Sequence, residues 1–154
     1  MEYNKSIFQR GQEMEYKTVI AERVRDGHVG IMTLNRPDKL NSWNHQLVDD
    51  IFSCLQDFKK DENMNVVIVK GAGKHFSAGL DFSQQLDKTG EEILAFFHKA
   101  FSIRILMQSM PQITIAAVHG VAAALGIHMV WFCDLAVASE DASIGVPAIN
   151  VGFG

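Results

Sequence analysis

Apolar and polar positions alternate in the first patterned part of the chain, and this alternation is typical of β-strands. The two β-rich runs are Tyr16–Val24 and His28–Leu34. They are separated by Arg25-Asp26-Gly27, whose Asp-Gly pair favours a hairpin turn. We therefore predict an antiparallel pair of strands at the start of the fold, preceded by a loose polar extension over residues 1–14.

Two later segments carry apolar residues at helical spacing. The first begins at Asn44 and ends near Lys60, and its apolar positions recur every three or four residues. The second spans Glu91–Gln108 and ends before Pro111, which punctuates the chain. The first pattern predicts an amphipathic helix, and the second predicts another helix.

Short, continuous apolar runs lie between and after these helices. Val66–Lys70 and Ile113–Val118 have the composition of strands buried on both faces. Gly120–Phe132 is typical of a small-residue turn that leads into a helix, and Asp134–Ala138 of a further strand. The order β-β-α-β-α-β-α-β predicts an α/β layered fold, and 154 residues suit one domain with a sizeable core.

Charge and composition narrow the classes of function. The net charge is −4 with a sequence pI near 5.8, and the basic residues are scattered, so nucleic acid and anionic membrane surfaces are poor partners. Cys54 and Cys133 lie far apart in apolar segments and are interpreted as reduced, buried thiols. The N-terminus has no apolar core of a secretory signal, which favours a cytoplasmic location.

One apolar stretch, Ile113–Ala138, has the hydropathy of a membrane span. It also contains His119, His128 and Asp134, and titratable groups at mid-bilayer cost a few kcal/mol each. Two buried strands that flank a short helix produce the same hydropathy. We therefore predict a core segment and no membrane span.

Two segments share a design in which a buried strand ends in small residues that turn directly into a helix. They end in HFSAGLD, up to Asp81, and in HGVAAALGIH, up to His128. Small residues let a ligand approach the backbone, and the first N–H groups of a helix lack intrahelical partners. If the two turns converge, their N–H groups form an oxyanion hole, a site for a negatively charged oxygen.

Three blocks of the sequence together resemble the crotonase (enoyl-CoA hydratase/isomerase) superfamily. They are IMTLNRPDKLNSWN, VVIVKGAGKHFSAGLDF and PQITIAAVHGVAAALGIHMVWFCDLAVAS, in family order, and the resemblance runs from about Glu15 to the end. It implies a crotonase/ClpP-like repeated ββα superhelix without the C-terminal trimerisation helices. Residues 15–154 would be an acyl-CoA-binding core that is incomplete at its C-terminus.

The resemblance also implies roles for particular residues. The backbone N–H groups of Ala78 and Leu125 would form the oxyanion hole, although family members more often have glycine where Leu125 stands. The loop with Lys39 and Leu40 would lie along the coenzyme A nucleotide, and Asp81 beside the pantetheine channel. The remaining positions implied to line the substrate site are Ser77, Gly79, Gly126 and Ala148. The alternatives are a solvated surface lysine at position 39 and an early-helix carboxylate at position 81.

The acid–base residues depart from the hydratase pattern. The positions of the two hydratase glutamates correspond to His128 and Ala148, and alanine cannot exchange a proton. His128 is a candidate single base because an imidazole titrates near neutral pH. The alternative is a core or rim histidine bonded to a backbone carbonyl.

Three functions remain open on these residues. The first is an enzyme that hydrates an enoyl-CoA or shifts its double bond through an oxyanion-stabilised enolate. The second is a non-catalytic acyl-CoA-binding module. The third is a serine hydrolase that uses Ser77, although HFSAG lacks the first glycine of a G-x-S-x-G elbow. No metal site is expected, coenzyme A would enter only as part of the substrate, and the resemblance implies a homotrimer or hexamer.

Overall fold

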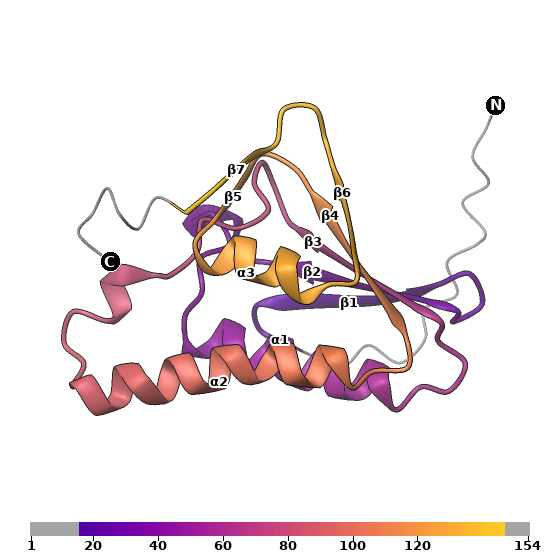
Figure 1. The fold of residues 1–154 in the computed structure, drawn as a ribbon, viewed down its shortest axis with the longest axis horizontal. Helices are drawn as coiled ribbons and strands as arrows, with labels where there is room; N and C mark the ends of the chain where they lie inside the picture. The colour runs from indigo at the N-terminus through magenta and orange to yellow at the C-terminus, as the bar shows by residue number, and fades with distance from the viewer. Residues whose placement is uncertain (1–15, 147–154) are drawn as a thin grey trace.

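The computed structural model describes residues 16–146, so Ala148 and the extension expected over residues 1–14 lie outside the described residues. Its strands are β1 (Val19–Val24), β2 (Val29–Leu34), β3 (Val66–Gly71), β4 (Ile113–Val118), β5 (Val121–Ala123), β6 (Leu135–Ala138) and β7 (Ser143–Gly145). Its α-helices are α1 (His45–Lys59), α2 (Gly90–Gln108) and α3 (Leu125–Phe132), and 3₁₀ turns form at Pro37–Lys39 and Phe82–Gln84. Figure 1 shows these elements.

The main sheet has five strands in the order β1-β2-β3-β4-β6. β1 and β2 form the predicted antiparallel hairpin, with Val24 opposite Val29. Arg25 and Asp26 both have left-handed φ values, 56° and 57°, as the hairpin turn requires. The other neighbours pair in parallel, and α1 and α2 connect successive parallel strands. The predicted α/β fold class is therefore confirmed.

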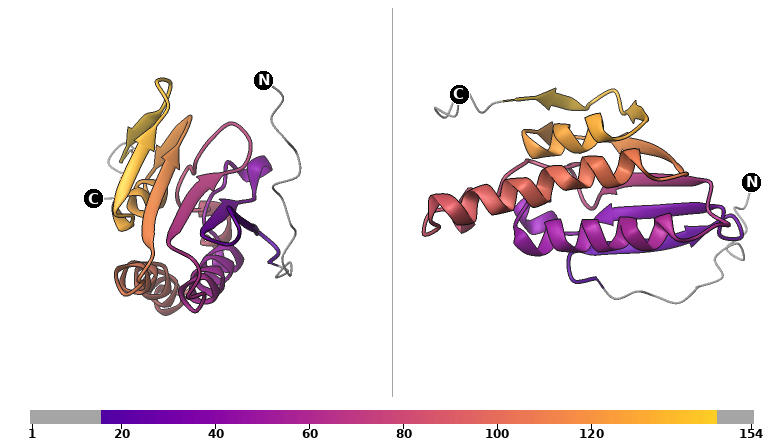
Figure 2. Two further views of the ribbon diagram at one scale, coloured as in Figure 1. Left: turned by 90° about the vertical axis from the view of Figure 1, so that its right-hand side faces the viewer. Right: turned by 60° about the horizontal axis from the view of Figure 1, so that its bottom comes forward.

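Both long helices begin where the sequence supplies a cap. The Asn44 side chain accepts a hydrogen bond from the Leu47 N–H at 2.8 Å at the start of α1. Thr89 and Glu92 form a reciprocal capping box at the start of α2. The two helices lie side by side under one face of the sheet (Figures 1 and 2). The apolar stripe of α1 packs into the core through Leu47, Val48, Ile51, Cys54, Leu55 and Phe58.

β3 and β4 are buried on one face only, which corrects the prediction that both of their faces are covered. Side chains of β3 and β4 alternate between buried and partly or fully exposed positions, and all four residues of β6 are exposed. Successive side chains of a strand point to opposite faces. The described helices α1 and α2 cover one face, so every second side chain of β3 and β4 stays accessible.

Short extended segments that follow the carboxyl ends of β3 and β4 pair with one another and with neighbouring segments. Trp43 bridges Leu80, Ser77 bridges Ala122, and β5 pairs with β7, all in parallel. Neither β5 nor β7 is predicted by the sequence pattern, because each has only three residues. This pairing brings the two small-residue turns together, and it therefore positions the candidate site.

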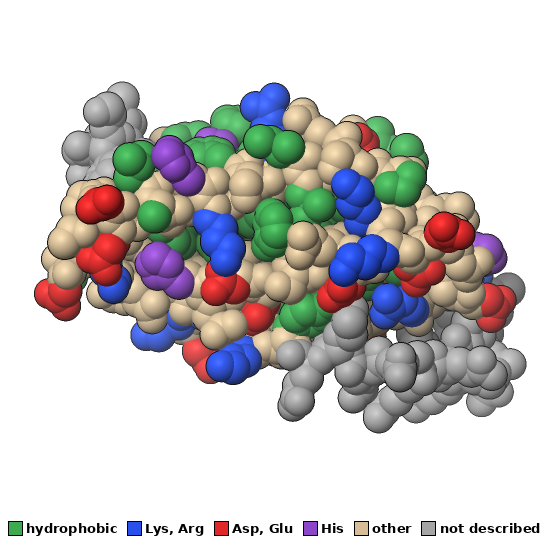
Figure 3. All heavy atoms as spheres, turned by 90° about the horizontal axis from the view of Figure 1, so that it is seen from below, with side chains coloured by type: hydrophobic (Ala, Val, Ile, Leu, Met, Phe, Trp, Pro, Cys, Tyr) green, Lys and Arg blue, Asp and Glu red, His purple; other side chains and the backbone are tan. Residues whose placement is uncertain are grey.

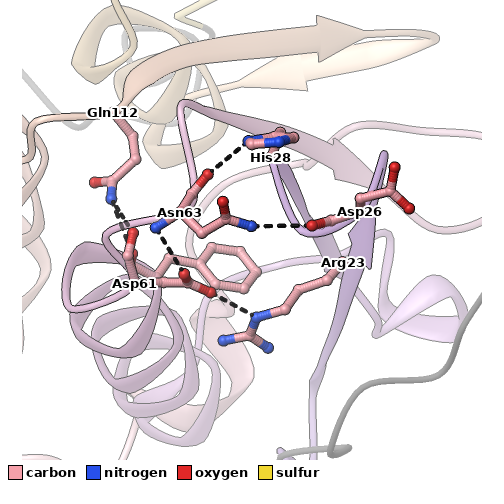
Figure 4. Close-up of polar contacts among 7 residues, drawn as sticks. Arg23, Asp26, His28, Asp61, Asn63 and Gln112 are labelled. Atoms are coloured by element: carbon pink, nitrogen blue, oxygen red, sulfur yellow. Dashed lines mark hydrogen bonds and ion pairs between the residues drawn. The ribbon is translucent and has the colours of Figure 1, made fainter.

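The opposite end of the sheet is closed by polar contacts among hairpin and loop residues (Figure 4). Arg23 Nε donates to Asp61 Oδ2 at 3.0 Å, and Asn63 Nδ2 donates to the Asp26 carbonyl at 2.9 Å. These contacts lie at the start of β3, whereas the turns follow its end. The two ends of the sheet are thus separate polar regions.

The surface gives little indication of a polyanion partner. On the face seen from below, basic and acidic side chains are interspersed (Figure 3). Over residues 16–146, none of the helices has both the length and the apolar content that a bilayer crossing requires.

Cys54 is buried and Cys133 is half-buried, and both are free thiols.

Candidate functional site

The two small-residue turns lie side by side just beyond the carboxyl ends of β3 and β4. We call residues 76–81 the first turn and residues 119–126 the second turn. The Ser77 N–H donates to the Val121 carbonyl at 3.0 Å, and the Ala123 N–H donates to the Ser77 carbonyl at 2.9 Å. Ligands of open parallel sheets bind outside the carboxyl ends of the strands. The turns that the sequence singled out are therefore adjacent, at the end where such sheets hold ligands.

Two glycines allow this close approach. A Cβ atom on Gly126 would lie 2.4 Å from the Ser77 carbonyl oxygen, which is far inside van der Waals contact. Gly79 has a φ of +96°, and a Cβ atom there would lie 2.7 Å from both the Ala123 oxygen and the Ala124 Cβ. Any larger residue at either position would push the two turns apart.

The Ala78 N–H, expected to be one of two free donors, already has a partner. It donates to the Leu40 carbonyl at 2.9 Å. The physical reason is peptide planarity: the Ser77 carbonyl accepts from Ala123, and in a trans peptide the N–H of the next residue points the opposite way. The Ala78 amide therefore faces the loop of Leu40 and points away from the second turn.

The free amide of the first turn is instead that of Leu80. The Gly79 carbonyl accepts a hydrogen bond from the Trp43 N–H at 2.6 Å, so the Leu80 N–H in the same trans peptide points away from Trp43. In the described part of the chain this N–H donates to no carbonyl. Sequence reasoning missed Leu80, because its direction depends on pairing with Trp43, which no local pattern reveals.

Leu125 contributes the first N–H of α3, a position without an intrahelical partner. A Cβ atom on Gly79 would lie 3.2 Å from the Leu125 nitrogen, so this amide lies directly beside the first turn. The Leu125 side chain is only 4% exposed and belongs to the hydrophobic core. The bulk of this leucine is thus accommodated in the core.

The residue before Leu125 is held in an unusual conformation. Ala124 has a φ of 47° and a ψ of −118°, a region that L-residues rarely adopt. Its carbonyl accepts hydrogen bonds from the N–H groups of Ile127 and His128, at 3.0 and 3.2 Å. This backbone path lets β5 turn into α3 within one residue and places the Leu125 amide at the site.

His128 lies one helical turn beyond Leu125 among aromatic rings. Its ring centroid is 5.5 Å from that of Phe101, 5.2 Å from Trp131 and 6.3 Å from Phe132. Its buried Nδ1 has no hydrogen-bond partner among the described residues, so the expected bond to a backbone carbonyl is not formed at that atom. Burial lowers the pKa of the imidazole, which favours the neutral form.

The loop of Lys39 and Leu40, which was expected to lie along the coenzyme A nucleotide, is joined to the first turn by hydrogen bonds. Lys39 and Leu40 are exposed, at the end of the 3₁₀ turn Pro37–Lys39. Below them Asn41 is fully buried, and its Nδ2 donates to the carbonyls of Ala72 and His75 at 2.9 and 2.8 Å. The exposed end of the loop is thus held on a rigid base.

Asp81 is committed to protein partners. Its Oδ2 accepts from Arg36 Nη2 at 3.0 Å, and its Oδ1 accepts from Ser83 Oγ at 2.6 Å. Burial opposes ionisation of this carboxyl group, but the bonds from Ser83 and Arg36 outweigh it and lower its pKa. Asp81 is a carboxylate in this structure, and Arg36 is a second residue of the region that sequence reasoning missed.

Ser77 does not have the surroundings of a nucleophile. It is fully buried, its Oγ donates to the Asn41 carbonyl at 2.8 Å, and the Gly79 N–H donates to it at 3.3 Å. The hydroxyl therefore ties the first turn to the loop. Within residues 16–146, no group of three histidine, cysteine or acidic side chains is arranged to hold a metal ion.

Comparison with known proteins places this geometry in context. The sequence model described as enoyl-CoA hydratase/isomerase matches residues 25–154. A probable enoyl-CoA hydratase of Mycobacterium bovis is 34% identical over 139 residues, which cover 90% of this chain and 52% of that protein. A mitochondrial Delta(3,5)-Delta(2,4)-dienoyl-CoA isomerase of Rattus norvegicus is 29% identical over 140 residues, covering 82% of this chain and 42% of that protein.

Solved structures give the same result for the fold. An enoyl-CoA hydratase/isomerase of Xanthobacter autotrophicus superposes with a TM-score of 0.83 at 29% identity, over 90% of this chain and 52% of that one. An enoyl-CoA hydratase/isomerase (crotonase) of Legionella pneumophila superposes with a TM-score of 0.81 at 31% identity, over 88% and 52%. These likenesses confirm the predicted crotonase-like fold, and the chain spans about half the length of the curated relatives it matches, 52% in the case of the Mycobacterium bovis protein.

Proposed function

Because the chain belongs to the enoyl-CoA hydratase/isomerase family, we propose that its two turns bind the thioester carbonyl of an acyl-coenzyme A. The N–H groups of Leu80 and Leu125 are the donors. The observation that carries this proposal is that the two turns meet at Gly79 and that each contributes a backbone amide, of Leu80 and of Leu125, without a carbonyl partner in the described residues. A carbonyl oxygen between them accepts two hydrogen bonds.

Two such donors support a reaction as well as binding. When a proton leaves the α-carbon of a thioester, or water adds to an enoyl group, negative charge develops on the carbonyl oxygen. Fixed N–H groups stabilise that charge more than the neutral carbonyl, and the loss of one donor typically costs about 2.7–4 kcal/mol of transition-state stabilisation. Hydration of an enoyl-CoA or a shift of its double bond are the reactions that this arrangement favours.

His128 is the side chain that we assign as the base in such a reaction. It lies one turn from the Leu125 amide, and its lowered pKa keeps the imidazole neutral and able to accept a proton. Lys39 and Leu40, exposed on the loop beside the first turn, are the residues proposed to contact the coenzyme A nucleotide. Coenzyme A is part of the substrate, and the proposal requires no further cofactor. A cytoplasmic location and a trimer or hexamer stay predictions.

A specific observation favours a second candidate, a module that binds acyl-CoA without turnover. The carboxylate of the first turn, Asp81, is held by Arg36 and Ser83 and so is not available for proton transfer. A positioned acid or base contributes typically about 10²–10⁴-fold to a rate. A site with a single imidazole would then bind the thioester well but react slowly.

One pair of measurements tests both candidates. Calorimetry with butanoyl-CoA, a saturated thioester that cannot be hydrated, measures binding. Turnover is measured by the loss of crotonyl-CoA absorbance on hydration and by the gain of the same absorbance when a 3-enoyl-CoA is converted to a 2-enoyl-CoA. Binding with turnover that is lost in His128→Gln supports the enzyme, and binding without turnover supports the module. If the folded protein binds butanoyl-CoA no better than free coenzyme A, the proposed carbonyl site is wrong.

A further inference from the structure

Arg36 forms hydrogen bonds with both of the chain segments that pair at the Trp43–Leu80 bridge. Its Nη1 donates to the Ser42 carbonyl, and its Nη2 donates to Asp81 Oδ2 at 3.0 Å. Ser42 precedes Trp43 and Asp81 follows Leu80, and Trp43 and Leu80 are the two residues of the parallel bridge. One guanidinium group therefore spans this bridge from its Trp43 side to its Leu80 side.

The bridge itself rests on two backbone hydrogen bonds. The Trp43 N–H donates to the Gly79 carbonyl at 2.6 Å, and the Asp81 N–H donates to the Trp43 carbonyl at 3.0 Å. An isolated bridge of this kind has no neighbouring ladder to hold its register. The Arg36–Asp81 ion pair supplies that support from the side chains, because it ties the residue after Leu80 to the residue before Trp43.

Burial and a further hydrogen bond hold the Arg36–Asp81 ion pair in one arrangement. The side chains of Arg36 and Asp81 are only 12% and 8% exposed, and Ser83 Oγ donates to the second oxygen of the carboxylate at 2.6 Å. A guanidinium group is planar, so its two contacts fix the direction of the partner as well as its distance. The Asp81 backbone therefore has little freedom to rotate. Leu80 is then held from both sides, by Asp81 after it and by the Gly79 carbonyl that accepts from Trp43 before it.

From these contacts we propose that Arg36, acting through Asp81, is a positioning residue that aims the Leu80 N–H at the ligand's carbonyl oxygen. The inference rests on the proposed function and deepens it. Neither side chain touches the ligand. Their effect is on the angle and distance of one hydrogen bond to the thioester, and an error of about 1 Å in such a position is enough to cost about 10²-fold in rate.

The chain offers a matched control at the other end of the sheet. Arg23 Nε and Asp61 Oδ2 are also 3.0 Å apart and partly buried, with 26% and 24% of their side chains exposed (Figure 4). This pair joins the hairpin to the loop before β3 and has no contact with either turn. Asp61→Asn therefore removes a comparable ion pair without changing the site.

The test uses the infrared stretching band of butanoyl-CoA labelled with ¹³C at the thioester carbonyl. Hydrogen bonds to a carbonyl lower its stretching frequency, and this readout needs no turnover. We expect a downward shift on binding to the unchanged protein and to Asp61→Asn. In Asp81→Asn and Arg36→Gln the shift should fall by roughly half, because one of two donors is misaligned, and Arg36→Lys should restore part of it. A variant that had lost only stability would keep the full shift once it was folded and saturated.

The outcomes separate the two levels of the proposal. A full shift in folded, saturated Asp81→Asn and Arg36→Gln overturns the positioning role alone. The absence of any shift in the unchanged protein overturns the proposed function, and the positioning role with it. If neither variant folds, Arg36→Lys keeps the positive charge but cannot reproduce both contacts of the planar guanidinium group, and a full shift in that variant equally overturns the positioning role.

Discussion

Gly79 lies against Leu125 so closely that a Cβ atom on the glycine would be 3.2 Å from the Leu125 nitrogen. This contact joins the first turn to the start of α3, and it brings the Leu80 and Leu125 amides to the same region. It depends on the absence of one carbon atom. The first prediction follows from that dependence.

We expect Gly79→Ala to lower the free energy of unfolding by about 2–6 kcal/mol. The positive φ of +96° strains an alanine, and the new Cβ atom would overlap the Ala123 oxygen and the Ala124 Cβ; each effect costs about 1–3 kcal/mol. Urea unfolding measures the loss. Gly90→Ala is the control, because nothing lies within 4 Å of its Cβ position, and it should leave stability unchanged or raise it by up to about 1 kcal/mol. Equal effects of the two substitutions would contradict the packing described for Gly79.

Ala124→Gly is expected to stabilise the protein, by about 1 kcal/mol. Glycine adopts the φ of 47° and ψ of −118° without strain, and this gain exceeds the greater entropy that glycine gives the unfolded chain. The midpoint of urea unfolding should therefore rise. Ala136→Gly, in β6 where no positive φ is present, should instead destabilise by up to about 1 kcal/mol. A loss of stability in Ala124→Gly would mean that the alanine is not strained.

Titration of His128 should make the protein less stable in mild acid. Burial lowers the pKa of His128 in the folded state below the ordinary value of 6.5, so the unfolded chain takes up a proton first as the pH falls. The contribution of this group is therefore complete above pH 6.5 and is lost as the pH falls from 6.5 toward the folded pKa. Urea unfolding at several pH values, compared with His128→Gln, isolates this contribution. A proton-NMR midpoint for the His128 ring at or above 6.5 would contradict it.

Both thiols should be unreactive in the folded protein. Burial, with a smaller contribution from a neighbouring aspartate, raises the pKa of Cys54 and of Cys133 to about 12, and the thiolate is the reactive form. A disulfide reagent at pH 8 should therefore label neither cysteine in native protein and both in urea. Rapid labelling of one thiol without urea, located by mass spectrometry, would show that its segment opens.

The sequence predicts local structure well where the signal is local. The hairpin follows from Asp26-Gly27, and α1 and α2 follow from apolar residues at helical spacing. β5 and β7 were missed because three residues carry no periodic signal and their pairing joins Val121 to Ser143, across α3 and β6. Pairing of this kind is decided by the whole fold.

The candidate site divides in the same way. The two turns follow from small residues at the ends of buried strands, and the Leu125 donor follows from the resemblance to the crotonase family. The choice of Leu80 over Ala78 does not, because it depends on which carbonyl of the first turn Trp43 binds. Arg36 Nη2 and Asp81 Oδ2 are 3.0 Å apart, but the sequence around each residue gives no sign that the two side chains form an ion pair.

The flat peptide between Gly79 and Leu80 has a consequence for how the chain can vary. One half of that peptide is fastened to Trp43, and the other half is the proposed donor, so the donor's aim is set by the path of the main chain. The side chain at position 80 does not set that aim, whereas the glycine before it is required. Proteins with different residues at this position can therefore share the same backbone donor. A comparison of reactive side chains alone would not detect this donor.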